Sequence, residues 1–497
     1  MSSPPAPTDI PSIPAALKRV ADEKPEAPAI IFESGGTSES VNWGELHRRS
    51  NRMARALTEQ GVKFGDLVTI ALPNSIAFIE AAYAVWKLGA TPQPVSARLP
   101  QAELDAIVAL AKTPLVIGGE TISAHRPVFS AEALVAASTD DSDLPDIVSP
   151  SWKAPTSGGS TGRPKLIVSG APGLIDVGTH ALFRMNPDDI ALMPGPLYHN
   201  GPFATAAAML QLGATVVLMP KFDAEASLAN IARHRVSWAY FVPTMMGRIW
   251  RLPHDVRAKY DISTLNTVWH LAAPCPVWLK EEWINWLGPD VVWELYGGTE
   301  ATGATTISGT EWLTHKGSVG KPVEGCLMKA FDEAGNALPP GETGEVYMKR
   351  APGFPPTYRY IGAEARTLPD GWESIGDIGR FDEEGYLYLA DRRNDMILVG
   401  GANIYPAEVE AALEEHPLVQ SSAVIGLPDE DLGNRVHAIV QPRSGLTIDD
   451  LERHLSERLV LYKRPRSIEF VNENLRDDAG KVRRSALRDE RIANTKS

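Results

Sequence analysis

The chain has 497 residues, 43% hydrophobic and 22% charged, a composition typical of globular proteins with more than one domain. Its 48 basic and 62 acidic residues give a formal net charge of -14, which argues against a general nucleic-acid binder. Two cysteines are too few for a disulfide framework, and the histidines lack metal-site spacing. No segment has the pattern of a secretory signal or a membrane span. We therefore expect a cytoplasmic enzyme without nucleic-acid partners or integral membrane contact.

Helices and short apolar strands alternate over the first half of the chain. The hydrophobic pattern predicts helices over residues 43–60, 76–88, 101–112 and 224–234, and strands over residues 67–72, 114–118, 214–219 and 238–242. Short apolar strands separated by helices are typical of βαβ units, so we expect largely parallel sheets with helices on both faces. Binding sites in such sheets lie at the carboxyl ends of the strands.

Beyond residue 330 the pattern changes to hairpins, with turn sequences at 332–336 and 382–385 that predict antiparallel pairing. A last segment starts at residue 391. There we expect a helix opened by Pro406, strands near 422–427 and 436–441, and a helix near 447–459. About a hundred residues are enough for a small α+β domain with its own core.

The sequence TSGGSTGRPK, residues 156–165, looks like a loop that holds phosphate. A Walker loop ends in Gly-Lys followed by Ser or Thr, because the lysine reaches the β and γ phosphates and the hydroxyl binds magnesium. Here an Arg-Pro pair separates Gly162 from Lys165, and Leu166 follows, so the Walker interpretation fails. The glycines and hydroxyls can still present donors to an anion. A flexible surface loop is the alternative.

Further polar clusters follow along the chain. In ELYGGTE, residues 294–300, the hydroxyl of Thr299 can bind a phosphate and the carboxylate of Glu300 can bind Mg²⁺. A capped turn with a solvated glutamate is the alternative. An aspartate is the usual partner of paired ribose hydroxyls, and a nearby arginine can serve ribose or phosphate oxygens. The remaining clusters are Gly376-Asp377, DRRND at 391–395 and Gly480-Lys481.

Together and in this order, the clusters resemble the adenylate-forming superfamily of acyl-CoA synthetases, beetle luciferases and peptide-synthetase adenylation domains, most closely bacterial carboxylate–CoA ligases. The match includes VNWGELHRRSNRMARAL, SGGSTGRPK, ELYGGTEATG, GSVGKPVEG, GEVYMKR, GWESIGDIG, DRRNDMILVGGANIYPAEVE and GKVRR. The resemblance implies an α/β fold with a large N-terminal domain of layered, mostly parallel sheets and a small β-barrel-like region. A small, mobile α+β domain follows. The implied domains are residues 1–390 and 391–497, with a hinge near Asn394.

In that family a carboxylate attacks the α-phosphate of ATP to give an acyl-adenylate and pyrophosphate, and a thiol or another nucleophile then displaces AMP. The resemblance therefore implies ATP, Mg²⁺ and coenzyme A, the last as a co-substrate. Such chemistry demands charge stabilisation at the α-phosphate and no covalent protein nucleophile. This demand accounts for the many donor loops and cations among the motifs.

The resemblance also implies residue roles. Lys481 would bridge the substrate carboxylate and the α-phosphate, Thr299 would bind the α-phosphate, Glu300 would bind magnesium, and His199 would gate the passage between acid and thiol. The implied nucleotide-binding residues are Ser160, Thr161, Gly162 and Lys165 for the phosphates, Ala273, Pro274, Tyr296 and Gly297 for adenine, and Asp377 and Arg392 for ribose.

The family alternates its C-terminal domain between two poses, one for each half-reaction. The second pose would present residues 399–403, in which Gly400 and Gly401 would line a tunnel for the pantetheine arm of CoA; an ordinary tight turn is the alternative. The chain departs from the family pattern at Gly158, Leu166 and Ile375, none of which removes a charged catalytic group. Asn394 also stands where Asp or Lys is common.

The acid pocket should be built from residues 197–201, 241–244, 271–272 and 293–295. These residues are apolar and partly aromatic, and no Asp stands where amino-acid adenylation domains hold an amine. We therefore expect a bulky hydrophobic carboxylic acid: aryl, alicyclic or of medium chain length. The leading hypothesis is a carboxylate–CoA ligase. An amide-forming ligase, in which a free amine captures the adenylate, is the alternative, and a nucleotide sensor without turnover is a third possibility.

Overall fold

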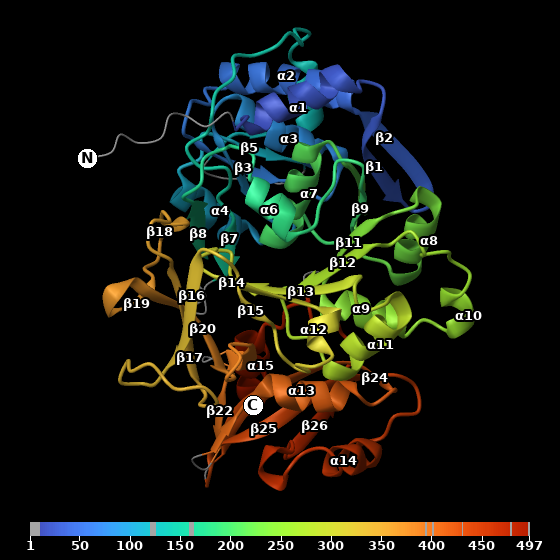
Figure 1. Cartoon of the computed structure of the whole chain (residues 1–497), viewed down its shortest axis with the longest axis vertical. Coiled ribbons are helices and arrows are strands. Elements are labelled where there is room, and N and C mark those ends of the chain that lie inside the picture. Colours follow the sequence, from blue (N-terminus) through green and yellow to red (C-terminus); the bar gives the residue numbers. More distant parts are fainter. Residues whose placement is uncertain are drawn as a thin grey trace.

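The computed structural model describes residues 10–119, 126–158, 164–392, 395–399, 402–429, 431–477 and 480–495. Figure 1 shows the N-terminal elements at one end of the molecule and the C-terminal elements at the other. Throughout these ranges, each helix is too short or too polar to cross a membrane.

The largest sheet has nine strands in the order β15-β14-β13-β12-β11-β9-β10-β1-β2. Its central pairs are parallel, and antiparallel strands close both edges. The parallel order therefore brings the carboxyl ends of β11, β12 and β13 to one edge. The strands are β1 (Pro28–Ser34), β2 (Thr37–Asn42), β9 (Ile190–Met193), β10 (Thr215–Leu218), β11 (Trp238–Phe241), β12 (Thr267–Leu271), β13 (Val292–Gly297), β14 (Ala304–Ser308) and β15 (Lys321–Pro322).

A second, wholly parallel sheet has the order β4-β3-β5-β6, and its helices share one large core with the nine-stranded sheet. Fully buried tryptophans from both parts, such as Trp86 and Trp269, belong to this core. Burial of such large apolar surfaces stabilises the layered arrangement. The strands are β3 (Leu67–Ala71), β4 (Thr91–Pro94), β5 (Val116–Gly118) and β6 (Val128–Phe129).

The helices of this region start where short polar side chains cap them. Asn42 accepts a hydrogen bond of 2.7 Å from the backbone of Glu45, so α2 begins at Trp43. The N-terminal helices are α1 (Ile13–Glu23), α2 (Trp43–Glu59), α3 (Ile76–Lys87), α4 (Gln101–Ala111), α5 (Ala131–Ala136), α6 (Val177–Leu182), α7 (Asn200–Leu212), α8 (Ala224–His234), α9 (Pro243–Trp250), α10 (His254–Arg257), α11 (Val277–Leu287) and α12 (Gly309–Trp312).

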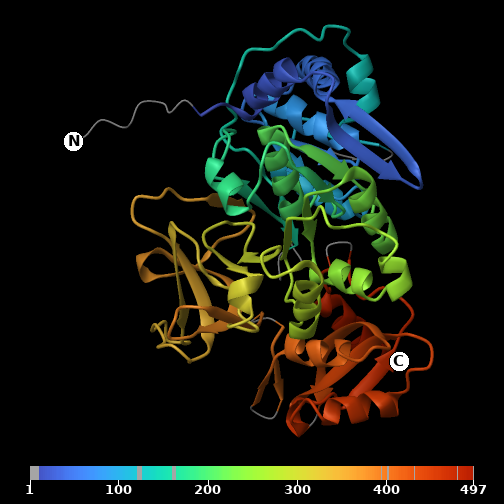
Figure 2. The same cartoon turned by 45° about the vertical axis from the view of Figure 1, so that its right-hand side comes forward.

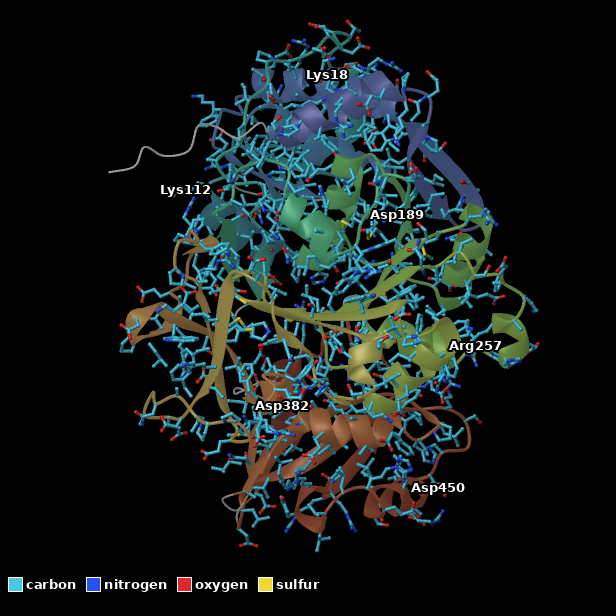
Figure 3. All side chains as sticks on the ribbon, in the orientation of Figure 1. Lys18, Lys112, Asp189, Arg257, Asp382 and Asp450 are labelled. Atoms are coloured by element: carbon cyan, nitrogen blue, oxygen red, sulfur yellow. The ribbon has the colours of Figure 1, made fainter. Side chains whose placement is uncertain are left out.

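Two antiparallel sheets follow the expected hairpins. Asp382 caps the turn between β20 and β21 by accepting backbone hydrogen bonds from Glu384 and Tyr386 at 3.0 and 2.8 Å (Figure 3). The five-stranded sheet contains β16 (Cys326–Phe331), β17 (Gly344–Arg350), β19 (Arg366–Leu368), β20 (Trp372–Phe381) and β21 (Leu387–Arg392). The three-stranded sheet contains β7 (Thr156–Gly158), β8 (Pro164–Ser169) and β18 (Tyr358–Ile361).

Figure 2 shows the C-terminal elements grouped at one end of the molecule. They enclose their own core, formed by buried residues between Ile397 and Leu475. The long hairpin of β24 and β25 is antiparallel, and β26 adds in parallel. The strands are β22 (Ile397–Val399), β23 (Ala402–Ile404), β24 (Val419–Asp429), β25 (Gly433–Pro442) and β26 (Ser467–Phe470), and the helices are α13 (Pro406–Glu414), α14 (Ile448–Ser456) and α15 (Arg484–Thr495). Short 3₁₀ turns cover Pro369–Gly371 and Leu461–Lys463.

The expected elements are confirmed, with boundaries shifted by a few residues. The predicted helices correspond to α2, α3, α4, α8, α13 and α14, and the predicted strands correspond to β3, β5, β10, β11, β24 and β25. Both predicted turns join antiparallel strands.

Two glycines before β15 provide a matched test of backbone packing. Gly320 has φ of 97°, and a Cβ there would collide with the carbonyl oxygen of Thr306; Gly317 has φ of 84° with open space around it. We expect Gly317→Ala to cost about 1–2 kcal/mol through backbone strain. Gly320→Ala should cost roughly 1–3 kcal/mol more because of the collision. Equal melting temperatures for the two variants would contradict this assignment.

Candidate active site

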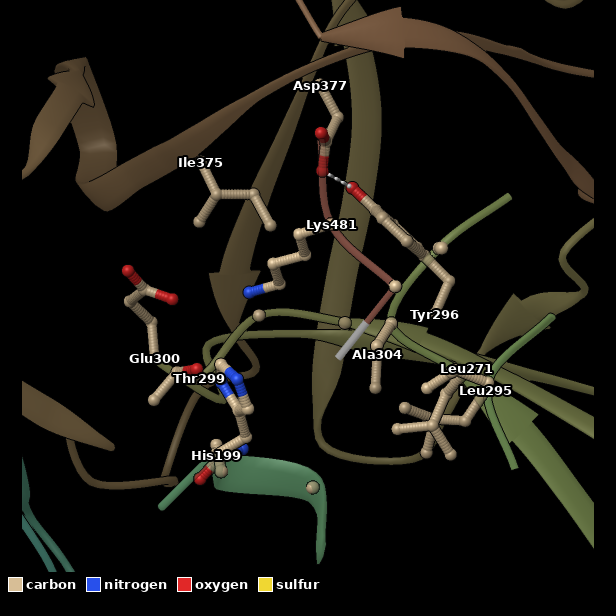
Figure 4. Close-up of a pocket in the computed structure, with 18 of the residues that line it drawn as sticks. His199, Leu271, Leu295, Tyr296, Thr299, Glu300, Ala304, Ile375, Asp377 and Lys481 are labelled. Atoms are coloured by element: carbon tan, nitrogen blue, oxygen red, sulfur yellow. Dashed lines mark hydrogen bonds between the residues drawn. The ribbon is translucent and has the colours of Figure 1, made fainter. Parts of the chain in front are cut away.

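A cavity of about 3170 Å³ lies between the carboxyl edge of the nine-stranded sheet, the antiparallel sheets and the C-terminal elements. Residues far apart in the sequence converge on it: His199 from the start of α7, Tyr296, Thr299 and Glu300 from the end of β13 onward, Asp377 from β20, and Lys481 before α15 (Figure 4). The structure therefore brings together the residues that the resemblance assigned to catalysis.

Tyr296 and Asp377 form one polar contact of the cavity. The Tyr296 hydroxyl donates a hydrogen bond of 2.6 Å to the Asp377 carboxylate, which is itself buried (Figure 4). Ala273 and Pro274 line the same cavity from the segment after β12. Ala272, just before them, has a φ of 75°, a strained conformation for a residue with a Cβ. A flat ring and a pair of hydroxyls could therefore lie along Tyr296 and Asp377.

Glu300 is held by two neighbours from the three-stranded sheet. The Tyr360 hydroxyl donates to its carboxylate at 2.5 Å, and the Lys165 amine lies 3.4 Å from the same oxygen. Burial and the Glu300 charge raise the pKa of Tyr360, so its hydroxyl keeps its proton. The sequence did not identify Tyr360, because its approach depends on β18 pairing with β8.

The donor set at Glu300 fits a magnesium ion that is shared with phosphates. Among the described residues, no group of three or more His, Cys, Asp or Glu side chains could hold a metal alone. Mg²⁺ is commonly bound by one or two carboxylates, with substrate phosphates and water completing its shell. The buried carboxylate of Glu300 matches that pattern and would hold the ion together with bound nucleotide.

Lys481 reaches the cavity on a turn that docks against the start of α9. Its backbone amide donates a 2.9 Å hydrogen bond to the Asp477 carboxylate. Gly480 has φ of 77°, and a Cβ there would lie 2.6 Å from the Thr244 hydroxyl. Glycine therefore permits the close approach, and the Lys481 amine points into the cavity toward Glu300 (Figure 4). The C-terminal residues thus present Lys481 to the cavity.

His199 precedes the first turn of α7 and faces the same cavity. Burial, followed by the positive charge of Lys481, lowers the pKa of His199 to about 4. Its imidazole is therefore neutral at neutral pH. The ring centroid of Tyr198 lies 4.5 Å away.

The residues expected to build the acid pocket divide between the cavity and the core. Its lining includes Tyr198, Asn200, Val242, Leu271 and Leu295. In contrast, Leu197, Phe241 and Trp293 pack against the large core and do not line the cavity. On β11 and β13 the reason is strand alternation, since Phe241 points opposite to Tyr240 and Val242.

Sequence reasoning also missed Lys153, a buried cavity residue just before β7. Its amine donates to the side chain of Asn200, and burial lowers its pKa to about 7. The sequence pattern that could have identified it is a lysine among mostly apolar residues just before a strand.

Glu294, which also lines the cavity, is paired with the buried Lys280 at 2.5 Å. Burial raises the pKa of the Glu294 carboxyl. This pairing leaves Glu294 poorly suited to hold a substrate amine.

Several expected site residues fall outside the described ranges: Ser160, Thr161, Gly162, Asn394, Gly400 and Gly401. The backbone of Arg392 pairs with Asp377 across β21 and β20, but its side chain is not described. Gly297 ends β13, where a Cβ would lie 3.2 Å from the Gly303 carbonyl oxygen.

Comparison with known proteins places the chain among enzymes that share this architecture. It is 33% identical over 484 residues to a feruloyl-CoA synthase of Amycolatopsis, covering 95% of this chain and 97% of the relative. It is also 31% identical over 522 residues to a CoA ligase of Rhodococcus jostii, and the match covers 96% of this chain and 98% of the relative. The acyl group named for that ligase is a propanoyl group that bears a methyl-dioxo-octahydro-indenyl ring system.

Among solved structures, the Bacillus subtilis o-succinylbenzoate CoA synthetase in complex with its acyl-adenylate superposes with a TM-score of 0.80 at 26% identity, over 95% of this chain and 97% of that one. The same enzyme has also been solved with ATP and a magnesium ion. Two family models match: AMP-binding enzyme over residues 17–358, and AMP-binding enzyme C-terminal domain over residues 408–481. The chain therefore belongs to the family of AMP-binding enzymes.

Proposed function

We propose that the chain activates a bulky hydrophobic carboxylic acid, aryl, alicyclic or of medium chain length, and transfers its acyl group to coenzyme A. The enzyme is an AMP-forming carboxylate–CoA ligase that uses ATP and Mg²⁺. The observation that carries this function is the convergence of Lys481 with Thr299, Glu300 and Asp377 in one cavity. The relatives that act on ring-bearing acids support the class of acid. A cytoplasmic location stays a prediction.

In the first half-reaction, a carboxylate oxygen of the acid bonds to the α-phosphorus of ATP, and pyrophosphate leaves. Lys481 would stand between these two anions and neutralise their repulsion, while Thr299 would donate to the α-phosphate. Magnesium bound through Glu300 would supply further positive charge to the phosphates. In the second half-reaction, the thiol sulfur of CoA bonds to the acyl carbon, AMP leaves, and the thiol proton passes to solvent.

The neutral imidazole of His199 suits a gate between the acid and the thiol. A charged ring beside Lys481 would repel that cation, whereas a neutral ring can pack against the acid or move aside. His199 would thus shape the passage without repelling the positive charge of Lys481.

The remaining assignments are proposals that rest on the resemblance. Ser160, Thr161 and Gly162 would join Lys165 in holding the β and γ phosphates, and Arg392 would lie beside the ribose. The domain boundary would fall between residues 390 and 391, with rotation about Asn394. Gly400 and Gly401 would then line the pantetheine tunnel. The separate core of the C-terminal elements supports such a rotation, because a domain with its own core can move as a unit.

The acceptor can be identified in one screen. Pyrophosphate release should be measured over a panel of aryl, alicyclic and medium-chain acids, with CoA or with free amines present. We expect acid-dependent release and consumption of the acid that requires CoA. Turnover with amines and none with CoA would instead establish the amide-forming alternative. Absence of pyrophosphate release with every acid would reject adenylation altogether.

Lys481→Ala should separate the two half-reactions. Loss of the bridging cation should lower the rate of adenylate formation by about 10²–10³, the usual effect of removing one transition-state stabiliser. Transfer from a preformed acyl-adenylate to CoA should stay within a few-fold of wild type, because that step needs no bridge between two anions. Lys316→Ala, at an exposed ion pair with Glu281, is the matched control. Equal losses in both half-reactions would refute the role of Lys481.

Asp377→Ala should raise the KM for ATP about 10- to 100-fold, since a hydrogen bond to a charged group contributes roughly 1.5–3 kcal/mol. Tyr296→Phe keeps the ring and removes the hydroxyl that donates to Asp377. It should raise this KM less than about fivefold, because the freed carboxylate can still bind ribose. The reverse order of the two KM values would show that the hydroxyl, rather than the carboxylate, binds the nucleotide.

A further inference from the structure

Lys153 introduces a buried amine into the cavity wall beside Asn200. It is 8% exposed, and its carbonyl accepts a 3.0 Å hydrogen bond from Ser169 in line with the β7–β8 ladder. Residue 157, four positions further along this extended segment, is the register partner of Lys165, and four extended residues span about 13 Å. The Lys153 amine contacts Asn200, a residue of the expected acid pocket, while the Glu300 charge acts on it only as a secondary influence that opposes the effect of burial on its pKa.

The Lys153 amine is incompletely satisfied. It donates to the Asn200 side chain and lies 4.3 Å from the ring centroid of Trp152. Within the described part of the chain, no carboxylate lies in ion-pair distance of this amine. An ammonium carries three N–H donors, and a buried cation without a counter-ion is costly. The amine can therefore donate to a molecule in the cavity.

Tyr240 brings a second buried donor to the same turn of α7. It stands on β11, and a Cβ on Gly201 would collide with its hydroxyl. Burial raises the pKa of Tyr240, so the hydroxyl keeps its proton. In the described ranges this hydroxyl has no hydrogen-bond acceptor. Two polar groups, one beside Asn200 and one beside Gly201, thus line the same part of the cavity.

We propose that Lys153 is a specificity-determining residue that binds an oxygen acceptor on the ring or distal part of the bulky acid. This inference rests on the proposed function and narrows its substrate class from any bulky acid to one that carries a carbonyl, hydroxyl or carboxylate oxygen away from the reacting carboxylate. An acid whose distal part is a hydrocarbon would exclude water from the Lys153 and Tyr240 donors without accepting a hydrogen bond from either. An oxygenated acid of the same shape satisfies a donor, and sites built for such bonds discriminate strongly.

The test compares acids of matched size by pyrophosphate release. One pair is cyclohexylpropanoic acid and its ring ketone, and the other is phenylpropanoic acid and its para-hydroxy analogue. The wild-type enzyme should favour the oxygenated member of at least one pair in kcat/KM. In Lys153→Met, which keeps the length of the side chain and removes the donors, that preference should fall about 10- to 100-fold, the effect of losing a hydrogen bond to a charged group. Lys153→Arg, which restores a cation, should recover part of it.

Lys165→Met is the matched control, and it should raise the KM for ATP without changing the preference between acids. Thermal melting checks folding, and Lys153→Met should melt no lower than wild type, because removing a buried unpaired charge costs little. An equal loss on both members of each pair, or a rise confined to the KM for ATP, would overturn the inference and leave the ligase function standing. Absence of pyrophosphate release by the wild type would overturn both.

Discussion

The close approach of Gly480 to Thr244 determines where a cation from the C-terminal elements enters the cavity. A side chain at residue 480 would collide with the Thr244 hydroxyl, so the contact requires glycine. The φ of 77° at this residue is a second reason, because it also favours glycine. The turn is held from behind by Arg476, which pairs with Glu410 and Glu414 at 3.3 and 3.2 Å. Since those carboxylates stand on α13, the turn is tied to the C-terminal core. Under the proposed rotation, a shift of that core would withdraw Lys481 together with the turn.

Cations enter the cavity of a protein whose net charge is negative. The formal net charge is -14, and Lys153, Lys165 and Lys481 line the cavity together with carboxylates such as Glu300 and Asp377. This arrangement suits the reaction, because ATP and a carboxylate bring several negative charges into a partly buried space. The low pKa of His199 has the same origin, since burial and the Lys481 charge both disfavour a further cation. The surface charge of the chain therefore says little about its ligands.

Local signals in the sequence predicted much of the fold and the charged part of the site. The Asp382 turn and the Pro406 helix start depend on neighbouring residues, so each was predicted from the sequence. Long-range pairing was not readable. Strand β9 lies between β10 and β11, although it precedes both in sequence. Tyr360 and Lys153 acquire their roles only through such distant neighbours, and the burial that shifts their pKa values has no local sequence pattern.

The pairing of β18 with β8 couples the β7–β8 hairpin to Glu300, the proposed magnesium ligand. Through this pairing, Tyr360 contacts the Glu300 carboxylate directly, and the Lys165 amine lies 4.0 Å from the Tyr360 ring centroid. Lys165 is thus paired with Glu300 before any phosphate arrives. In the proposed reaction Lys165 would exchange that carboxylate for phosphate oxygens, and Glu300 would then hold magnesium, which would supply positive charge to the phosphates. Magnesium at Glu300 would free Lys165 for the phosphates, and bound phosphates would give Lys165 a new partner. The arrangement would therefore favour joint binding of nucleotide and magnesium over binding of either one alone.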